Sequence, residues 1–228
     1  MKKEIGVLML LSAVLLSGCG SDEPVKLIEA SENEEVRLYA VNETDDEVHG
    51  VTVEINGSQK NFDWNILNTG TKPQVFYTDL TGDSKEEAVI IINTGRGTEL
   101  DTFDIHVINA EDLSEIKVQN HEEIVANQIE THVSKNADDT LDITVKTKEK
   151  EDNFDSNIEL APNYNQDELA FGGVVIYQVE HQKIILSLGA SVGISPQYVC
   201  SVNVTYKFDH AKNEFIADQI DFAPNENV

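Results

Sequence analysis

Apolar residues recur at every second position through most of the chain, and this alternation limits the fold more than any other feature of the sequence. The pattern runs through VRLYAV at 36–41 and VHGVTVEI at 48–55. A period of two places the apolar side chains on one face of a β-strand. Similar runs, alternating or continuously apolar, return at 60–66, 74–80, 87–93, 103–109, 114–119, 129–135, 141–148, 171–180, 183–189, 198–209 and 214–222.

Turn residues separate these runs at intervals typical of antiparallel sheets, about 8 to 12 residues. Asn56-Gly57, for example, favours a tight hairpin. A short helix is expected at 121–127, and no other segment after residue 18 has sustained helical periodicity. We therefore predict an all-β fold of mainly antiparallel strands, a blade-like or sandwich ectodomain with at most one or two short helices.

The first eighteen residues have the pattern of a signal peptide. A basic head, Lys2-Lys3, precedes an apolar run at 5–16 that is too short to cross a bilayer, which needs about 20 residues. The following Leu16-Ser17-Gly18-Cys19 resembles the lipobox of bacterial lipoproteins. The resemblance implies cleavage before Cys19 and a diacylglycerol on its sulfur, which would hold the protein on the extracytoplasmic face of the cell membrane. The alternative is a plain secretory signal with an incidental cysteine.

The sequence predicts three regions, the first of which would be removed by cleavage. Residues 1–18 form the signal peptide, and 19–35 form the lipidated cysteine with a flexible acidic tether. Residues 36–228 form the β-rich ectodomain. A charged segment rich in proline and asparagine makes 149–168 the expected boundary between two sub-modules that share one core.

The charge of the chain limits its partners. Its formal net charge is −26 at pH 7. A surface this acidic repels phosphate backbones, so we expect no nucleic-acid partner. The expected partners are the membrane, through the lipid anchor, and a protein of the cell envelope.

The most acidic turn, DLTGDSKEE at 79–87, lies between two predicted strands. Calcium prefers six to eight oxygen ligands. Alternate positions of this turn offer the side chains of Asp79, Thr81, Asp83 and Glu87 and the carbonyl of Lys85. The turn is therefore either a weak calcium site or a solvated acidic hairpin.

This turn resembles the Asp-rich turn of FG-GAP and VCBS-type repeats. Asp79, Gly82 and Asp83 match that pattern, whereas Thr81 and Glu87 depart from it. The resemblance implies a turn between neighbouring strands of a β-blade that often binds calcium. Over most of residues 50–222 the chain is also similar to uncharacterised secreted lipoproteins of Bacillus-type bacteria, a resemblance that implies location and a β fold but no activity.

Two further motifs suggest sites. Gly189-Ala190-Ser191-Val192-Gly193 matches the G-x-S-x-G pattern of serine hydrolases, but a strand-like run rather than a helix follows it, so a small-residue bulge in a hairpin is the preferred interpretation. Arg96 lies in the glycine-rich segment 93–98 and is a candidate contact for a ligand or partner; the alternative is a structural hairpin loop.

These features favour a non-enzymatic binding or structural module of the cell envelope, with calcium as the one cofactor considered and none required. The alternatives are an accessory or sensor subunit of a membrane complex, and a serine hydrolase that uses Ser191.

Overall fold

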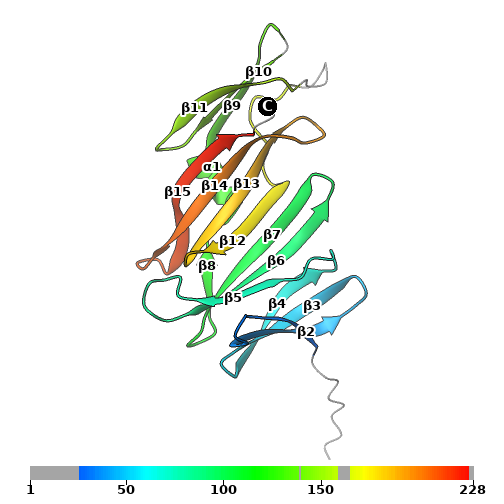
Figure 1. The fold of residues 1–228 in the computed structure, drawn as a ribbon, viewed down its shortest axis with the longest axis vertical. Coiled ribbons are helices and arrows are strands. Elements are labelled where there is room, and N and C mark those ends of the chain that lie inside the picture. Colours follow the sequence, from blue (N-terminus) through cyan, green and yellow to red (C-terminus); the bar gives the residue numbers. More distant parts are fainter. Residues whose placement is uncertain (1–25, 139, 159–164, 226–228) are drawn as a thin grey trace, which may run out of the picture.

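The computed structural model describes residues 26–138, 140–158 and 165–225. Within these ranges the chain forms fifteen strands and one short helix, so the predicted all-β fold is confirmed (Figure 1). No helix in the described part is long and apolar enough to cross a membrane. The elements are β1 (Leu27–Ala30), β2 (Val36–Glu43), β3 (Glu47–Ile55), β4 (Ser58–Leu67), β5 (Gln74–Thr78), β6 (Glu87–Gly97), β7 (Leu100–Asn109), β8 (Glu115–Val118), α1 (His121–Gln128), β9 (Glu130–Lys135), β10 (Leu141–Lys146), β11 (Glu151–Ser156), β12 (Val174–Glu180), β13 (Lys183–Val192), β14 (Gln197–Asp209) and β15 (Glu214–Pro224).

The first sheet is an antiparallel meander in the order β1-β2-β3-β4. Asn56 and Gly57 connect β3 to β4 with φ values of 50° and 85°. Both values lie in the left-handed region that Asn-Gly hairpin turns require, so the turn predicted from this pair is present. Figure 1 shows this sheet, in blue and cyan, at the lower end of an elongated molecule.

The predicted flexible tether is wrong from Leu27 onward. Residues 27–30 form β1, which pairs with β2 in a register that joins Leu27 to Tyr39. After β1 the Ser31 hydroxyl accepts a hydrogen bond from the Val36 amide at 3.0 Å. The strand was missed because four residues show no period by themselves, and pairing with β2 supplies the stability. The predicted signal peptide at 1–18, Cys19 and residues 20–25 lie outside the described residues.

The second sheet has eight strands in the order β12-β13-β14-β15-β8-β7-β6-β5. Most neighbours are antiparallel, but β15 pairs with β8 and β12 pairs with β7 in parallel. Because β6 occupies one edge of β7 along its length, β8 and β12 share the other edge. Six strands are thus linked in a closed ring, from β7 through β8, β15, β14, β13 and β12 back to β7.

Strand β6 is buried on both faces, which explains its uninterrupted apolar run. The buried apolar side chains of the described residues form two cores. Val89 and Ile91 pack in the first core, together with residues of β12–β15. Ala88, Ile90 and Ile92 pack in the second core, against the first sheet. A strand covered on both sides has no need of polar alternation, and β6 consequently joins the two cores.

The third sheet, in the order β11-β10-β9, lies at the upper end of the molecule (Figure 1). Leu141, Ile143 and Val145 of β10 belong to the same core as β12–β15. The predicted boundary at 149–168 contains β11, an edge strand that pairs with β10 along its whole length. Part of that charged segment is therefore regular structure, and the chain on both sides of it contributes to one core.

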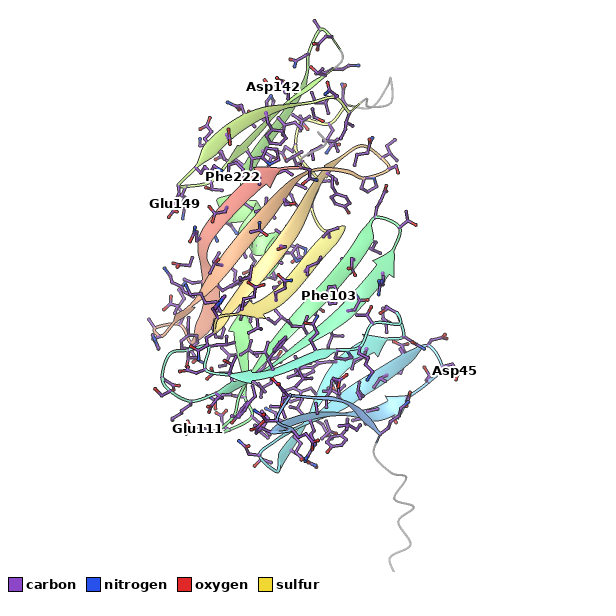
Figure 2. The ribbon with its side chains drawn as sticks, in the orientation of Figure 1. Asp45, Phe103, Glu111, Asp142, Glu149 and Phe222 are labelled. Atoms are coloured by element: carbon purple, nitrogen blue, oxygen red, sulfur yellow. The ribbon has the colours of Figure 1, made fainter. Side chains whose placement is uncertain are left out.

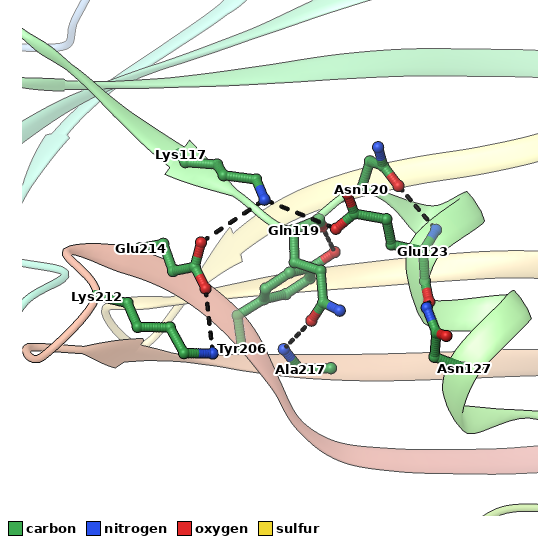
Figure 3. Close-up of polar contacts among 9 residues, drawn as sticks. All are labelled: Lys117, Gln119, Asn120, Glu123, Asn127, Tyr206, Lys212, Glu214 and Ala217. Atoms are coloured by element: carbon green, nitrogen blue, oxygen red, sulfur yellow. Dashed lines mark hydrogen bonds and ion pairs between the residues drawn. The ribbon is translucent and has the colours of Figure 1, made fainter.

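Polar contacts hold α1 against the second sheet (Figure 3). The Asn120 side chain caps the helix by accepting a hydrogen bond from the Glu123 amide at 2.8 Å. Before the cap, the Gln119 carbonyl accepts from the Tyr206 hydroxyl at 2.8 Å. The Gln119 side-chain oxygen accepts from the Ala217 amide at 3.1 Å. The start of the only described helix is therefore tied to both β14 and β15.

Candidate functional site

The acidic turn between β5 and β6 is held by its own backbone. The two carboxylate oxygens of Asp79 accept hydrogen bonds from the Gly82 amide at 2.7 Å and the Ser84 amide at 3.0 Å. Asp83 accepts from the Lys85 amide at 2.9 Å. Gly82 has φ 79°, a value that favours glycine. These bonds fix the shape of the turn.

Glu87 is the buried acidic residue of this turn, with only 2% of its surface exposed. Its carboxylate accepts hydrogen bonds from the amides of Leu80 at 2.9 Å and Thr81 at 3.3 Å. Burial raises the pKa of Glu87 above its ordinary value, the two amides oppose that shift, and the charges of Asp83 and Asp79 add to it. Glu87 therefore closes the base of the turn at an electrostatic cost.

The predicted calcium ligands do share one turn, but backbone amides contact the carboxylates of Asp79, Asp83 and Glu87. The Lys85 ammonium forms an ion pair with Glu111 at 2.7 Å, at the lower left corner of the molecule in Figure 2. Across the described ranges, no group of three or more His, Cys, Asp or Glu side chains is placed to hold a metal ion. Calcium at this turn stays a prediction from the sequence.

Ser191 is part of a bulged strand. The register between β13 and β14 shifts between Ala190 and Ser191, as the small-residue interpretation predicts. The side chain is buried, and its hydroxyl donates to the Ala170 carbonyl at 3.4 Å. Ser191 pairs with Tyr198 near one end of β14, whereas Asp209 ends that strand. The eleven intervening steps of about 3.3 Å place Asp209 and His210 roughly 36 Å away, too far to activate the serine.

Arg96 lies near the end of β6, in a hairpin with β7. Its side chain is exposed, and one guanidinium nitrogen donates to the Thr71 hydroxyl at 2.7 Å. Thr71 is also part of the wall of a groove beside the first sheet. The structure therefore brings the predicted contact residue to the edge of a concave surface.

This groove has a volume of about 460 Å³. It lies at the end of the first sheet where β2 turns into β3, the corner at which Figure 2 labels Asp45. Five short segments form its wall, at residues 26–28, 43–44, 47–48, 66–68 and 71–73. We refer to this surface as the basal groove.

The floor of the basal groove is apolar. Ile66 belongs to the second core, and Ile28 and Val48 pack against that core. Leu27 and Leu67 also contribute to the groove, and 50% and 40% of their surfaces are exposed. The groove is thus the open end of the core between the first sheet and β6.

The rim of the basal groove carries both signs of charge. Lys26 forms an ion pair with Glu43. Lys72 forms an ion pair with Glu29 at 3.2 Å. Glu47, also in the rim, contacts His49. Two lysines and two glutamates line the groove, so its formal charge is zero in a chain whose net charge is −26.

Sequence reasoning missed this site because its wall comes from segments that have no common motif. The one available signal was the consecutive pair Ile66-Leu67 at the end of an alternating strand, where two adjacent apolar residues cannot both face the core.

Comparison of the chain with family models, with curated proteins and with solved structures finds no match.

Proposed function

We propose that this protein is a lipid-anchored lipoprotein on the extracytoplasmic face of the cell membrane, where it acts as a non-enzymatic binding module of the envelope. The lipobox-like segment that ends at Cys19 supports the anchor. The basal groove supports the binding role, and one of its lining residues, Lys26, is the first residue that the structure describes.

The observation that carries the binding role is the combination of size and chemistry in the basal groove. Its volume of about 460 Å³ falls within the range of ligand pockets, roughly 300 to 1,000 Å³. Leu27 and Leu67 offer apolar surface, and Lys72 and Glu47 offer charges for orientation. A site of this kind suits an amphipathic ligand.

The anchor is tested by membrane fractionation of the full chain and of a Cys19→Ala variant. The wild-type protein should sediment with membranes and carry a diacylglyceryl group on Cys19 by mass spectrometry. The variant should lose the lipid adduct. Wild-type protein without a lipid adduct would contradict the anchoring proposal.

A second candidate function, an accessory or sensor subunit, is favoured by two joined hairpin tips. Leu100 and Ile194 have 42% and 78% of their surfaces exposed. The tips are connected because the Tyr198 hydroxyl donates to the Glu99 carbonyl at 2.6 Å. The Ser195 hydroxyl also donates to the Glu99 carboxylate at 3.4 Å, so the two apolar side chains lie on adjoining tips, and apolar side chains exposed close together can form a protein contact. A photo-crosslinking amino acid at Ile194 in living cells should capture a specific envelope protein if this function is correct, and a position such as Val41 serves as the control.

A further inference from the structure

We infer that the basal groove binds a phospholipid with a phosphoethanolamine headgroup, drawn from the membrane that holds the protein. The inference rests on the proposed anchor and adds the identity of the ligand. It is derived from where the groove lies, from its apolar floor and from the charges on its rim.

The groove is within reach of the bilayer surface. Lys26 forms part of its rim and is seven residues from Cys19. An extended chain spans at most about 3.6 Å per residue, so roughly 25 Å separates the two at most. Tethering at this distance gives membrane lipids a high effective concentration at the groove.

The apolar floor suits the upper part of an acyl chain. Ile28, Val48 and Ile66 extend the second core into the groove. Leu27 and Leu67 leave half or nearly half of their surfaces in water. A bound acyl segment would cover both leucines, and each Å² of apolar surface removed from water is worth about 25 cal/mol.

The charges of the rim select the headgroup. Lys26 and Lys72 can contact a phosphate, and Glu43 and Glu47 can contact an ammonium group. A headgroup with only a negative charge would be repelled by the two glutamates, and the rest of this acidic protein would add to the repulsion. An ethanolamine ammonium also donates hydrogen bonds to carboxylates, which gives this headgroup both kinds of contact.

Photolabelling of the full lipidated chain tests the inference. The protein is reconstituted in phosphatidylcholine vesicles that contain a small fraction of phosphatidylethanolamine with a diazirine near the glycerol end of one acyl chain. After irradiation and digestion, mass spectrometry should find most adducts at residues 27–28 and 66–67. Lys72→Gln and Leu67→Ser should each lower the yield at these positions by about fivefold or more.

Lys207→Gln is the matched control, because Lys207 is also an exposed lysine paired with a carboxylate, at 2.6 Å from Asp218, and has no part in the groove. It should leave the labelling unchanged. The inference would be overturned by adducts spread over many surfaces, or by a labelling yield that stays unchanged in Lys72→Gln and Leu67→Ser. Equal labelling by an otherwise identical phosphatidylglycerol probe would overturn the choice of headgroup.

The result is separable from the anchoring proposal. Vesicle attachment through Cys19 is measured by flotation before irradiation. Protein that floats with the vesicles but gives no groove adducts retains the proposed anchor and rejects the lipid site. Protein that fails to float rejects the anchor itself.

Discussion

Replacement of Ile90 by alanine tests whether the two cores unfold together. Ile90 is fully buried in the second core, and its neighbour Ile91 is fully buried in the first. Loss of three buried carbon atoms from isoleucine costs about 2–5 kcal/mol, whereas Ile→Val costs about 0.5–1.5 kcal/mol. In a chain of this size each kcal/mol lowers the Tm by roughly 2–4 °C. We therefore expect Ile90→Ala to lower the Tm by about 4–20 °C and Ile90→Val by about 1–6 °C.

Trp64, the only tryptophan of the chain, makes the test selective. It lies in β4 of the first sheet and stacks on His106 of β7, with 3.8 Å between the ring centroids. Its fluorescence therefore reports the contact between the first and second sheets, and far-UV circular dichroism reports the strands of the whole chain. Because β6 belongs to both cores, the two signals should change at one temperature in wild type and in the Ile90→Ala and Ile91→Ala variants.

The opposite result would be informative. If Ile90→Ala lowers the midpoint of the Trp64 signal and leaves the midpoint of the circular dichroism in place, the first sheet unfolds alone. The reasoning from a shared β6 would then be wrong.

Four further predictions concern single side chains. Asp79→Ala should lower the Tm more than Asp83→Ala in calcium-free buffer, because Asp79 accepts two backbone hydrogen bonds and Asp83 one. Calcium at millimolar concentrations should raise the wild-type Tm to a saturating value, and Asp83→Ala should abolish this rise. A wild-type Tm that does not change with calcium would contradict the predicted calcium site. Because burial raises the pKa of Glu87, the folded chain binds the proton of this carboxyl more tightly than the unfolded chain does. The resulting contribution to stability is present below about pH 4.5 and is lost as the pH rises through the raised pKa. In urea titrations the free energy of unfolding of Glu87→Gln should therefore increase relative to that of wild type as the pH rises from about 4 to 7. Burial raises the pKa of the Cys200 thiol to about 11. Iodoacetamide at pH 8 should therefore label Cys200 about a hundredfold more slowly in folded than in urea-unfolded protein. Equal labelling rates would contradict the burial of this thiol. Tyr198→Phe should cost about 1 kcal/mol in urea unfolding, because it removes one hydrogen bond between hairpin tips, and an unchanged midpoint would show that this bond is not stabilising.

Much of the fold was predictable because strand alternation is a local property. The runs at 36–41, 87–93 and 198–209 all lie in strands, and the short helix begins at His121 as expected. The order of the strands was not predictable. Parallel pairing of β15 with β8 and of β12 with β7 joins segments far apart in sequence, and the residues carry no mark of these partners.

The sites were predicted less completely than the strands. The sequence located the Asp79–Glu87 turn, but it gave no sign that backbone amides would occupy the carboxylates, because that depends on the φ values within the turn. The bulge at Ser191 was predicted from small residues that permit an irregular strand. The basal groove was missed because it lies where no segment covers the end of the second core. Which end stays uncovered depends on how the whole first sheet is placed.

The outer edge of β15 carries hydrogen-bonding groups that could recruit a strand from another molecule. Within the described chain, Gln119 occupies this edge at the Phe215 carbonyl, 2.8 Å away, and at the Ala217 amide. Farther along, the Lys150 ammonium donates to the Phe222 carbonyl at 3.2 Å. Beyond the short parallel pairing with β8 at Glu214 and Phe215, side chains and one backbone bond thus take the place of a neighbouring strand at intervals along β15. At high local concentration of the protein, this shielding would keep copies of the chain from joining into intermolecular sheets.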